Sequence, residues 1–449
     1  MRKGNRILSG LLALVMAAVM LLCPAEAITY EPDFTPTSKA VYLENLDTGL
    51  ILYEKNADEK MYPASLTKIM TAIVVLENVK DLDGETAEYP MWIQNMLYGT
   101  NASLGGLIVG EELTIRQLLT SALVQSGNES AMILAGYVGS GGMADFMPRD
   151  ITTFVEMMND KAKALGCTGT HFTNPTGLHS DNTYTTARDM AIMAKYAMQK
   201  SVFSSIVKNY AVQLGQTNKH ADLWQYSTNK MLLTSSPYYY APVVGIKTGS
   251  TDEAGRCVIS QAEDSGYHYF CVVMGSPVTA AEPYQNFIET RQLYRWAFGN
   301  FSLRTLLEQG ELMAEVPVKY SGDGKVAKLA IKEDVVQLLR DDISLDSIIY
   351  KAELPEFVEA PIEAGDTVGK MHIMLMGEEI GTVELVATQA FSLSWFRKAL
   401  GTIGSLLSST VAKVIFIVVV LAIAGYVVYA VRHNKKRKKH RSKYSDRNY

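Results

Sequence analysis

The sequence predicts an α/β fold of the α+β type, in which helices flank an antiparallel sheet, followed by a small all-β domain and a C-terminal transmembrane helix. Three observations lead to this prediction. Helical patterns dominate residues 63–200, and three strands in meander order follow at 242–274. Short apolar runs separated by turn sequences fill residues 312–390. An apolar run without a charge occupies residues 414–431 and is long enough to cross a bilayer.

Residues 1–27 are predicted to form a secretory signal peptide. Arg2, Lys3 and Arg6 precede an apolar stretch, and the small residues Ala25 and Ala27 frame a cleavage site. The alternative interpretation is an N-terminal anchor that is retained. A cleaved signal predicts that the mature chain is exported.

A domain of helices and strands is expected over residues 28–311. The turn sequence Asp47-Thr-Gly49 predicts a hairpin, and Gly166 ends one of the helical patterns. We expect helices at 65–77, 113–137 (two, broken around 126–128), 151–165, 185–200 and 284–298. We expect strands at 40–46, 50–54, 242–247, 257–262 and 267–274.

The C-terminal part of the chain is predicted to contain four further segments. A small β-rich domain at 312–390 is followed by an amphipathic juxtamembrane helix at 391–413, the transmembrane helix at 414–431 and a basic tail at 432–449. Basic residues beside a span stay in the cytoplasm, so we expect a plasma-membrane protein with residues 28–413 on the extracytoplasmic side. A simple stalk helix and a nucleic-acid role for the tail are the alternative interpretations.

The distribution of charge argues against nucleic acid as a partner. The formal net charge is −5, but the tail and the signal peptide together hold 12 of the 42 basic residues and only 2 of the 47 acidic ones. The remaining 30 basic and 45 acidic residues give the exported part a net charge of −15. An acidic exported domain repels polyanions.

The cysteines and histidines predict neither a disulfide framework nor a metal site. The mature chain has three cysteines at unpatterned spacing, Cys167, Cys257 and Cys271, and few, scattered histidines. Pairing Ala262 with Tyr267 across the expected turn places Cys257 and Cys271 on opposite faces of the sheet. We therefore expect no disulfide, no metal and no cofactor.

Three short motifs in a fixed order carry the chemistry. They are Ser65-Leu-Thr-Lys68, Ser126-Gly-Asn128 and Lys247-Thr-Gly249, separated by 61 and 121 residues. Each occurs by chance in long chains, so an exposed helix start, a pair of helix caps and a strand-end turn are the respective alternatives. The ordered set of all three is much more specific and indicates a serine acyl-transfer site.

Ser65 and Lys68 are predicted to be nucleophile and base. A helix N-terminus at Ser65 offers N–H groups to an oxyanion, and Lys68, three residues on, lies on the same face. A lysine accepts a proton from serine only when its pKa is lowered, as burial and the nearby cation Lys247 would do. Ser126 is expected to relay a proton to the leaving nitrogen, and Asn128 to bind a substrate amide.

The third motif is expected to hold the substrate at the end of a strand covering residues 243–246. Lys247 and Thr248 suit a terminal carboxylate, and Gly249 lets the substrate lie against the strand edge. The N–H of Ser250 is expected to be the second oxyanion donor.

Longer segments around the motifs resemble a known family. Low-molecular-weight penicillin-binding proteins, the D-alanyl-D-alanine carboxypeptidases of the serine-type S11 peptidase family, are similar over roughly residues 35–300 and, more weakly, over 312–390. The segments that carry the resemblance are Pro63-Ala-Ser-Leu-Thr-Lys-Ile-Met-Thr-Ala72, Gln125-Ser-Gly-Asn-Glu129, Phe172-Thr-Asn-Pro-Thr-Gly-Leu178, Tyr184-Thr-Thr-Ala-Arg-Asp-Met190 and Gly245-Ile-Lys-Thr-Gly-Ser-Thr251.

This resemblance implies a penicillin-binding transpeptidase/β-lactamase-like domain that removes the terminal D-alanine from peptidoglycan stem peptides through a Ser65 acyl-enzyme and is inhibited by β-lactams. It makes Lys68 the base, and Ser126 and Asn128 assistants in proton transfer and amide binding. The chain departs from many relatives in two ways. A full membrane span follows its amphipathic helix, and the arginine that some relatives use to bind carboxylate has no match in sequence. Arg256 is the candidate for that role. A β-lactamase and a penicillin or peptidoglycan sensor without turnover are the alternative functions.

Overall fold

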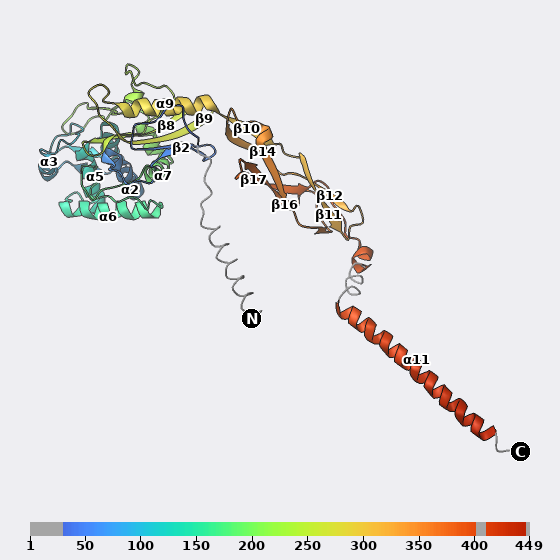
Figure 1. The fold of residues 1–449 in the computed structure, drawn as a ribbon. Coiled ribbons are helices and arrows are strands. Elements are labelled where there is room, and N and C mark those ends of the chain that lie inside the picture. The colour runs from blue at the N-terminus through green and yellow to red at the C-terminus, as the bar shows by residue number, and fades with distance from the viewer. Residues whose placement is uncertain (1–29, 401–409, 446–449) are drawn as a thin grey trace, which may run out of the picture. The chain divides into compact units, whose positions relative to one another are not determined.

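The computed structural model describes residues 30–400 and 410–445, so the predicted signal peptide at 1–27 lies outside the described residues. The chain folds into two compact units (Figure 1). A unit of helices and one main sheet is followed by a β-rich unit, which confirms the predicted fold class. Unit 1 comprises residues up to 303 together with 338–343, and unit 2 comprises 304–337 and the residues from 344 onward.

A five-stranded antiparallel sheet forms the centre of unit 1, with the strand order β2-β1-β9-β8-β7. A two-residue turn joins β8 to β9, and its residues Ser265 and Gly266 have φ angles of 52° and 85°, which suit such hairpins. The strands are β1 (Ala40–Asn45), β2 (Ile51–Lys55), β7 (Lys247–Thr251), β8 (Gly255–Asp264) and β9 (Tyr267–Ser276).

The pairing of β8 with β9 differs from the predicted register by two residues. Ala262 pairs with Tyr269 and not with Tyr267, because the turn is only two residues long. A shift of two residues leaves each side chain on its predicted face, whereas a shift of one would reverse it. Cys257 and Cys271 accordingly pack on opposite faces of the sheet, and both are free.

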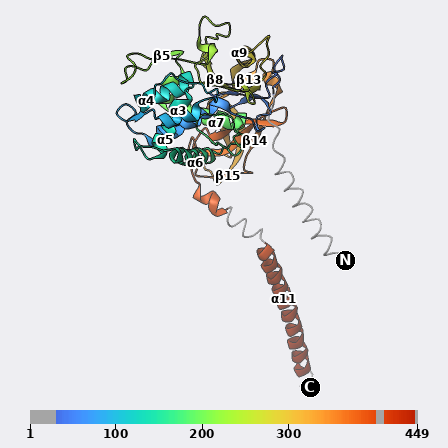
Figure 2. The ribbon, with the colours of Figure 1, turned by 90° about the vertical axis from the view of Figure 1, so that its left-hand side faces the viewer.

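Helices cover both faces of this sheet. Helix α9 (Gln285–Asn300) packs on β8 and β9, whereas α7 (Ala187–Met198) packs on β1 and β9 from the other face. In both views α9 lies on one side of β8, and α5 (Asn128–Gly139), α6 (Pro148–Ala164) and α7 lie on the other (Figures 1 and 2). Helix α2 (Lys68–Asn78) packs against α5, α6 and α7, so its first eight residues are buried on every side.

Smaller elements complete unit 1. Two short antiparallel strand pairs were not predicted, β3 (Thr86–Glu88) with β4 (Glu112–Thr114) and the β5–β6 hairpin of β5 (Ala211–Gln213) with β6 (Trp224–Tyr226). The remaining helical segments are η1 (Ala64–Thr67), α3 (Met91–Leu97), α4 (Ile115–Thr120), the π-helical η2 (Ser121–Gln125), α8 (Ser201–Val207) and η3 (Lys230–Leu232).

Unit 2 contains a six-stranded sheet of order β14-β16-β17-β12-β11-β15. Its strands are β11 (Leu312–Lys319), β12 (Val326–Ile331), β14 (Ile348–Glu353), β15 (Val358–Glu359), β16 (Thr367–Leu375) and β17 (Glu378–Ala387). A separate two-stranded sheet pairs β10 (Phe301–Leu307) with β13 (Val335–Arg340), and η4 (Leu345–Ser347) precedes β14.

The predicted juxtamembrane helix starts later than expected. Phe391 is buried and pairs with Ile362 through backbone hydrogen bonds, so this part of 391–413 still belongs to the β-rich unit. Helical residues follow at 395–400, and residues 401–409 lie outside the described part. Helix α11 (Thr410–Ser445) contains a segment, Lys413–His433, that is long and apolar enough to cross a membrane.

Candidate active site

Ser65 lies in η1, which leads directly into α2. The predicted helix therefore begins with a 3₁₀ turn, and Lys68 is its first α-helical residue. Side chains three residues apart eclipse each other in a 3₁₀ turn. This geometry places the Nζ of Lys68 3.0 Å from the Oγ of Ser65.

Two glycines make room for the segment around Ser65. Ala64 has a φ of 47°, a strained value for a residue with a side chain, and such strain concentrates at functional sites. A Cβ on Gly249 would lie 2.9 Å from the carbonyl oxygen of Pro63 and 3.1 Å from the amide nitrogen of Ser65. A Cβ on Gly177 would lie 1.9 Å from the carbonyl oxygen of Ala64. Gly249 thus lets β7 approach the segment around Ser65, a contact that the sequence did not predict.

The amine of Lys68 is completely buried and surrounded by acceptors. Its Nζ lies 2.5 Å from Oδ1 of Asn128 and 2.7 Å from the backbone carbonyl oxygen of Thr176. Burial, and then the charge of Lys247, hold the pKa of Lys68 well below its usual value, while Glu129 acts in the opposite direction. The lowered pKa favours the neutral amine, and a neutral amine can accept a proton.

The second motif occupies the predicted helix break, which the structure confirms. The π-helical segment η2 follows α4 and ends at Gln125, directly before Ser126, and α5 begins at Asn128. Ser126 has a φ of 65°, another strained value. In this conformation its Oγ accepts a hydrogen bond of 2.9 Å from the Nζ of Lys247.

Lys247 begins its strand, so the prediction that the third motif ends a strand at 243–246 was wrong. Gly245 has a φ of 130°, and a Cβ there would lie 2.7 Å from the carbonyl oxygen of Val207. This conformation interrupts the pleat, and the regular strand starts only after it. Lys247 is completely buried, and burial lowers its pKa to about 7.

A cavity of about 390 Å³ opens over these groups. Lys68, Asn128 and Lys247 are buried and do not line it, but the two lysines contact the hydroxyls of Ser65 and Ser126, which do. The predicted site residues that line the cavity are Ser65, Ser126, Thr248, Gly249 and Ser250.

Further residues at the cavity carry positive charge. Arg256 and Lys230 both line it and lie over the ring of Tyr284, at 4.9 and 4.7 Å from its centroid. The Nε of Arg256 is buried and has no hydrogen-bond partner. Arg256, the candidate arginine named from the sequence, pairs with Ser250 across β7 and β8, whereas nothing in the sequence indicated Lys230.

The loop after β6 also contributes to the cavity. Thr228 lines it, and its hydroxyl forms a hydrogen bond with the hydroxyl of Thr248. Tyr210, which precedes β5, lines the cavity as well. Among the residues that the structure describes, no group of three or more His, Cys, Asp or Glu is placed to hold a metal ion.

Comparison with known proteins assigns this chain to a family. Residues 26–278 match the family model of the S11 peptidases, described as D-alanyl-D-alanine carboxypeptidase, and residues 301–392 match the C-terminal domain of penicillin-binding protein 5. The chain belongs to the D-alanyl-D-alanine carboxypeptidase family. This membership confirms the predicted serine-type carboxypeptidase and its acylation by β-lactams, and it does not favour a β-lactamase or a sensor.

Individual relatives agree with the family assignment. D-alanyl-D-alanine carboxypeptidase DacF of Bacillus subtilis is 29% identical over 396 residues, which are 86% of this chain and 95% of that protein. D-alanyl-D-alanine carboxypeptidase of Streptomyces sp. K15 is 34% identical over 272 residues, 59% of this chain and 88% of that protein. Penicillin-binding protein 5 from Haemophilus influenzae superposes with a TM-score of 0.60 at 26% identity, covering 81% of this chain and all of that one.

Proposed function

We propose that the chain trims the terminal D-alanine from peptidoglycan stem peptides with Ser65 as nucleophile and Lys68 as base. The Oγ of Ser65 attacks the carbonyl carbon of the penultimate D-alanine, and its proton passes to the Nζ of Lys68. The observation that carries the proposal is the 3.0 Å distance between these atoms, with Lys68 fully buried and Ser65 at the surface of the cavity.

The surroundings of Lys68 favour the neutral amine in an orientation suited to this step. A neutral amine has two N–H groups and one lone pair. The oxygens of Asn128 and Thr176 lie within hydrogen-bond distance and accept the two N–H groups. The lone pair is then left for the hydroxyl proton of Ser65. Asn128 thereby orients the base, in addition to its expected contact with the substrate amide.

Ser126 and Lys247 supply the proton that the leaving group needs. The hydroxyl of Ser126 gives its proton to the departing amine nitrogen and takes one from Lys247, to which it is hydrogen bonded. In the second half-reaction, water attacks the ester that joins the shortened peptide to Ser65, and it loses a proton to Lys247 through Ser126. Ser65 then regains its proton from Lys68. A pKa of about 7 for Lys247 suits both directions of transfer.

The cavity lining supplies the remaining contacts. The backbone N–H groups of Ser65 and Ser250 would hold the oxyanion. Thr248 and Arg256 line the cavity with Ser250, and they would bind the terminal carboxylate together with the charge of Lys247. The unpartnered Nε of Arg256 supports this role, because a buried guanidinium nitrogen without a partner is costly.

The test is the release of free D-alanine from a pentapeptide ending in D-Ala-D-Ala, together with labelling by a fluorescent penicillin. The Ser65→Ala variant should lose both activities and keep the thermal unfolding temperature of the wild type, because the small Ser65 side chain is partly exposed at the cavity. Ser103→Ala, at another serine of the same cavity, is the matched control and should retain both. Labelling that persists in Ser65→Ala would contradict the assignment.

We further propose that the helix at 414–431 anchors the protein in the plasma membrane with the catalytic unit on the extracytoplasmic side. The basic residues that follow the apolar segment support this orientation. In intact protoplasts, added protease should digest an epitope in unit 1 and leave an epitope at residue 449 protected. The opposite pattern would reverse the orientation.

A further inference from the structure

A row of exposed aromatic rings lies beside the catalytic cavity on the β5–β6 hairpin. Trp224 and Tyr226 are 47% and 50% exposed, whereas Gln225 between them is buried, as expected when neighbouring residues of a strand face opposite sides. The rings of Trp224 and Tyr226 are stacked 6.5 Å apart, and the ring of Tyr210 lies 6.1 Å from that of Tyr226. An exposed group of large apolar side chains is typical of a binding surface.

This aromatic row, Tyr210–Tyr226–Trp224, is continuous with the cavity. Tyr210 itself lines the cavity, and so does Thr228, which follows Tyr226 by two residues and contacts Thr248. Four residue steps separate Thr228 from Trp224, a span of at most about 14 Å. A ligand that occupies the cavity therefore reaches the row if it extends by a few residues.

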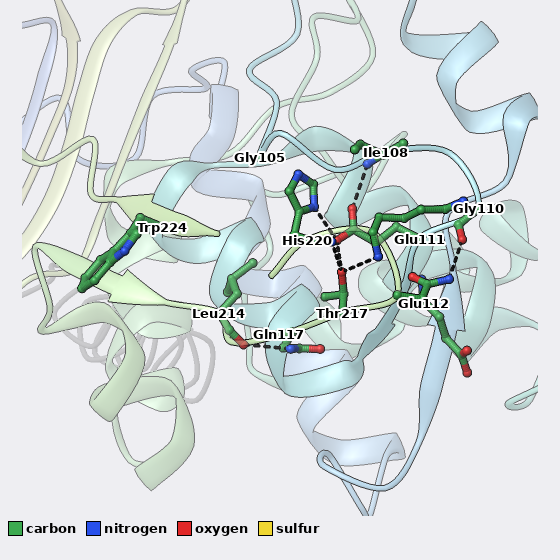
Figure 3. A network of polar contacts seen from close by, with 12 residues as sticks. Gly105, Ile108, Gly110, Glu111, Glu112, Gln117, Leu214, Thr217, His220 and Trp224 are labelled. Atoms are coloured by element: carbon green, nitrogen blue, oxygen red, sulfur yellow. Dashed lines mark hydrogen bonds and ion pairs between the residues drawn. The ribbon is translucent and has the colours of Figure 1, made fainter. Parts of the chain in front are cut away.

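A buried carboxylate fastens the segment between β5 and β6 to the rest of unit 1 (Figure 3). Glu111 has a fully buried side chain, which accepts hydrogen bonds from the hydroxyl of Thr217 at 2.6 Å and from the N–H of Ile108 at 2.9 Å. It also lies 2.8 Å from the Nδ1 of His220. Figure 3 shows the indole of Trp224 extending away from this cluster. The hairpin is thus held in place before a ligand arrives, which lowers the entropic cost of binding.

The chemistry of the row fits a sugar better than a protein. Asp222 accepts hydrogen bonds from the Nε1 of Trp224 at 3.2 Å and from the Nε2 of Gln213 at 2.6 Å, so polar groups border the flat rings. A pyranose ring likewise combines an apolar C–H face with a polar edge. Two half-exposed rings and the partly buried Tyr210 offer far less than the roughly 800 Å² per partner of a stable protein interface.

We propose that the aromatic row is a saccharide subsite, which binds a sugar of the glycan strand to which the stem peptide is attached. This inference rests on the proposed function. In a pentapeptide substrate four residues separate the sugar from the bond that is cut, a span of at most about 14 Å. A stem peptide of this length can therefore reach from the cavity to the aromatic row, because Thr228 at the cavity lies at most as far from Trp224. The enzyme would then prefer stem peptides that are still attached to glycan.

The experiment compares three substrates of the full-length enzyme: an N-acylated tripeptide ending in D-Ala-D-Ala, the free pentapeptide, and the same pentapeptide attached to its disaccharide. Trp224→Ala should lower kcat/KM on the disaccharide pentapeptide about tenfold, the loss typical of removing one well-packed contact. It should leave the other two substrates and the rate of penicillin acylation unchanged. Trp224→Phe should restore most of the loss. Tyr98→Ala, at an 87% exposed tyrosine outside the cavity lining, is the control.

Three outcomes would overturn the saccharide subsite. An unchanged kcat/KM on the disaccharide pentapeptide would show that Trp224 contacts no sugar. Equal losses on the free and the sugar-bearing pentapeptide would mean that the row contacts the peptide. Losses on all three substrates and in penicillin acylation would mean that the hairpin only shapes the cavity. Failure of the proposed function would look different, because the wild type would then release no D-alanine from the tripeptide.

Discussion

Replacing Lys68 with methionine is expected to remove the base while largely preserving the fold. The two side chains are similar in volume, so methionine can fill the fully buried position. The oxygens of Asn128 and Thr176 would lose a hydrogen-bond donor, at about 1–3 kcal/mol for each buried acceptor left unsatisfied. We therefore expect a moderate fall in the thermal unfolding temperature and a folded protein at 25 °C.

The effect on acylation should be much larger. Loss of general-base assistance slows a reaction by about 10²–10⁴. Acylation of the wild type should accelerate as pH rises through the lowered pKa of Lys68, because only the neutral amine accepts the proton. Lys68→Met should lack this acid limb. Lys68→Arg should acylate equally slowly and unfold more easily, since an unpaired buried charge costs about 3–5 kcal/mol.

Rapid-quench labelling with fluorescent penicillin between pH 5 and 9 measures these rates, and competition by unlabelled penicillin measures binding. A rate for Lys68→Met within about tenfold of the wild type would refute the assignment of Lys68 as base. Another group would then take the proton from Ser65, and Ser126 would be the first to test. Greater stability of Lys68→Arg than of Lys68→Met would show instead that Lys68 is charged in the folded protein.

Gly249→Ala should lower the acylation rate at least tenfold, because the added Cβ would lie 2.9 Å from the carbonyl oxygen of Pro63; an unchanged rate would show that β7 can move away. The kcat/KM for D-alanine release should fall as pH rises above about 7, because Lys247 then loses the charge that holds the carboxylate and supplies the proton; a profile that still rises at pH 9 would contradict this role. A chain that ends at residue 394 should unfold at a higher temperature than one that ends at residue 390, because only the longer chain contains the buried Phe391. Equal unfolding temperatures would place Phe391 outside the β-rich unit. Glu111→Ala should speed proteolysis within residues 214–222 without changing penicillin acylation, and unchanged proteolysis would show that other contacts fasten this segment.

Much of the chemistry could be predicted from local sequence. The spacing of Ser65 and Lys68 already places both side chains on one face of a helical turn, whichever type of turn forms. The break at Ser126 followed from the change in helical pattern, and the meander of β7, β8 and β9 from their turn sequences. The apolar run near the C-terminus likewise indicates a span by its length alone.

Errors in the sequence-based predictions arose where backbone geometry departs from the apolar pattern. The strand expected to end at Lys247 begins there, because Gly245 adopts a conformation that hydrophobicity does not encode. The helix expected from Phe391 begins later, because that residue pairs with Ile362, a partner 29 positions earlier in the chain.

The sequence by itself therefore determined which groups we propose for the reaction, since nucleophile, base, proton relay and carboxylate-binding groups are a matter of residue type and local spacing. Only the tertiary structure decided how those groups behave. The lowered pKa of Lys68 requires burial and the proximity of Lys247, which is far away in the sequence. The clearance at Gly177 and Gly249 and the placing of the aromatic row beside the cavity also depend on contacts between distant segments. Desolvation and close packing are properties of the folded chain, and no local pattern of residues specifies them.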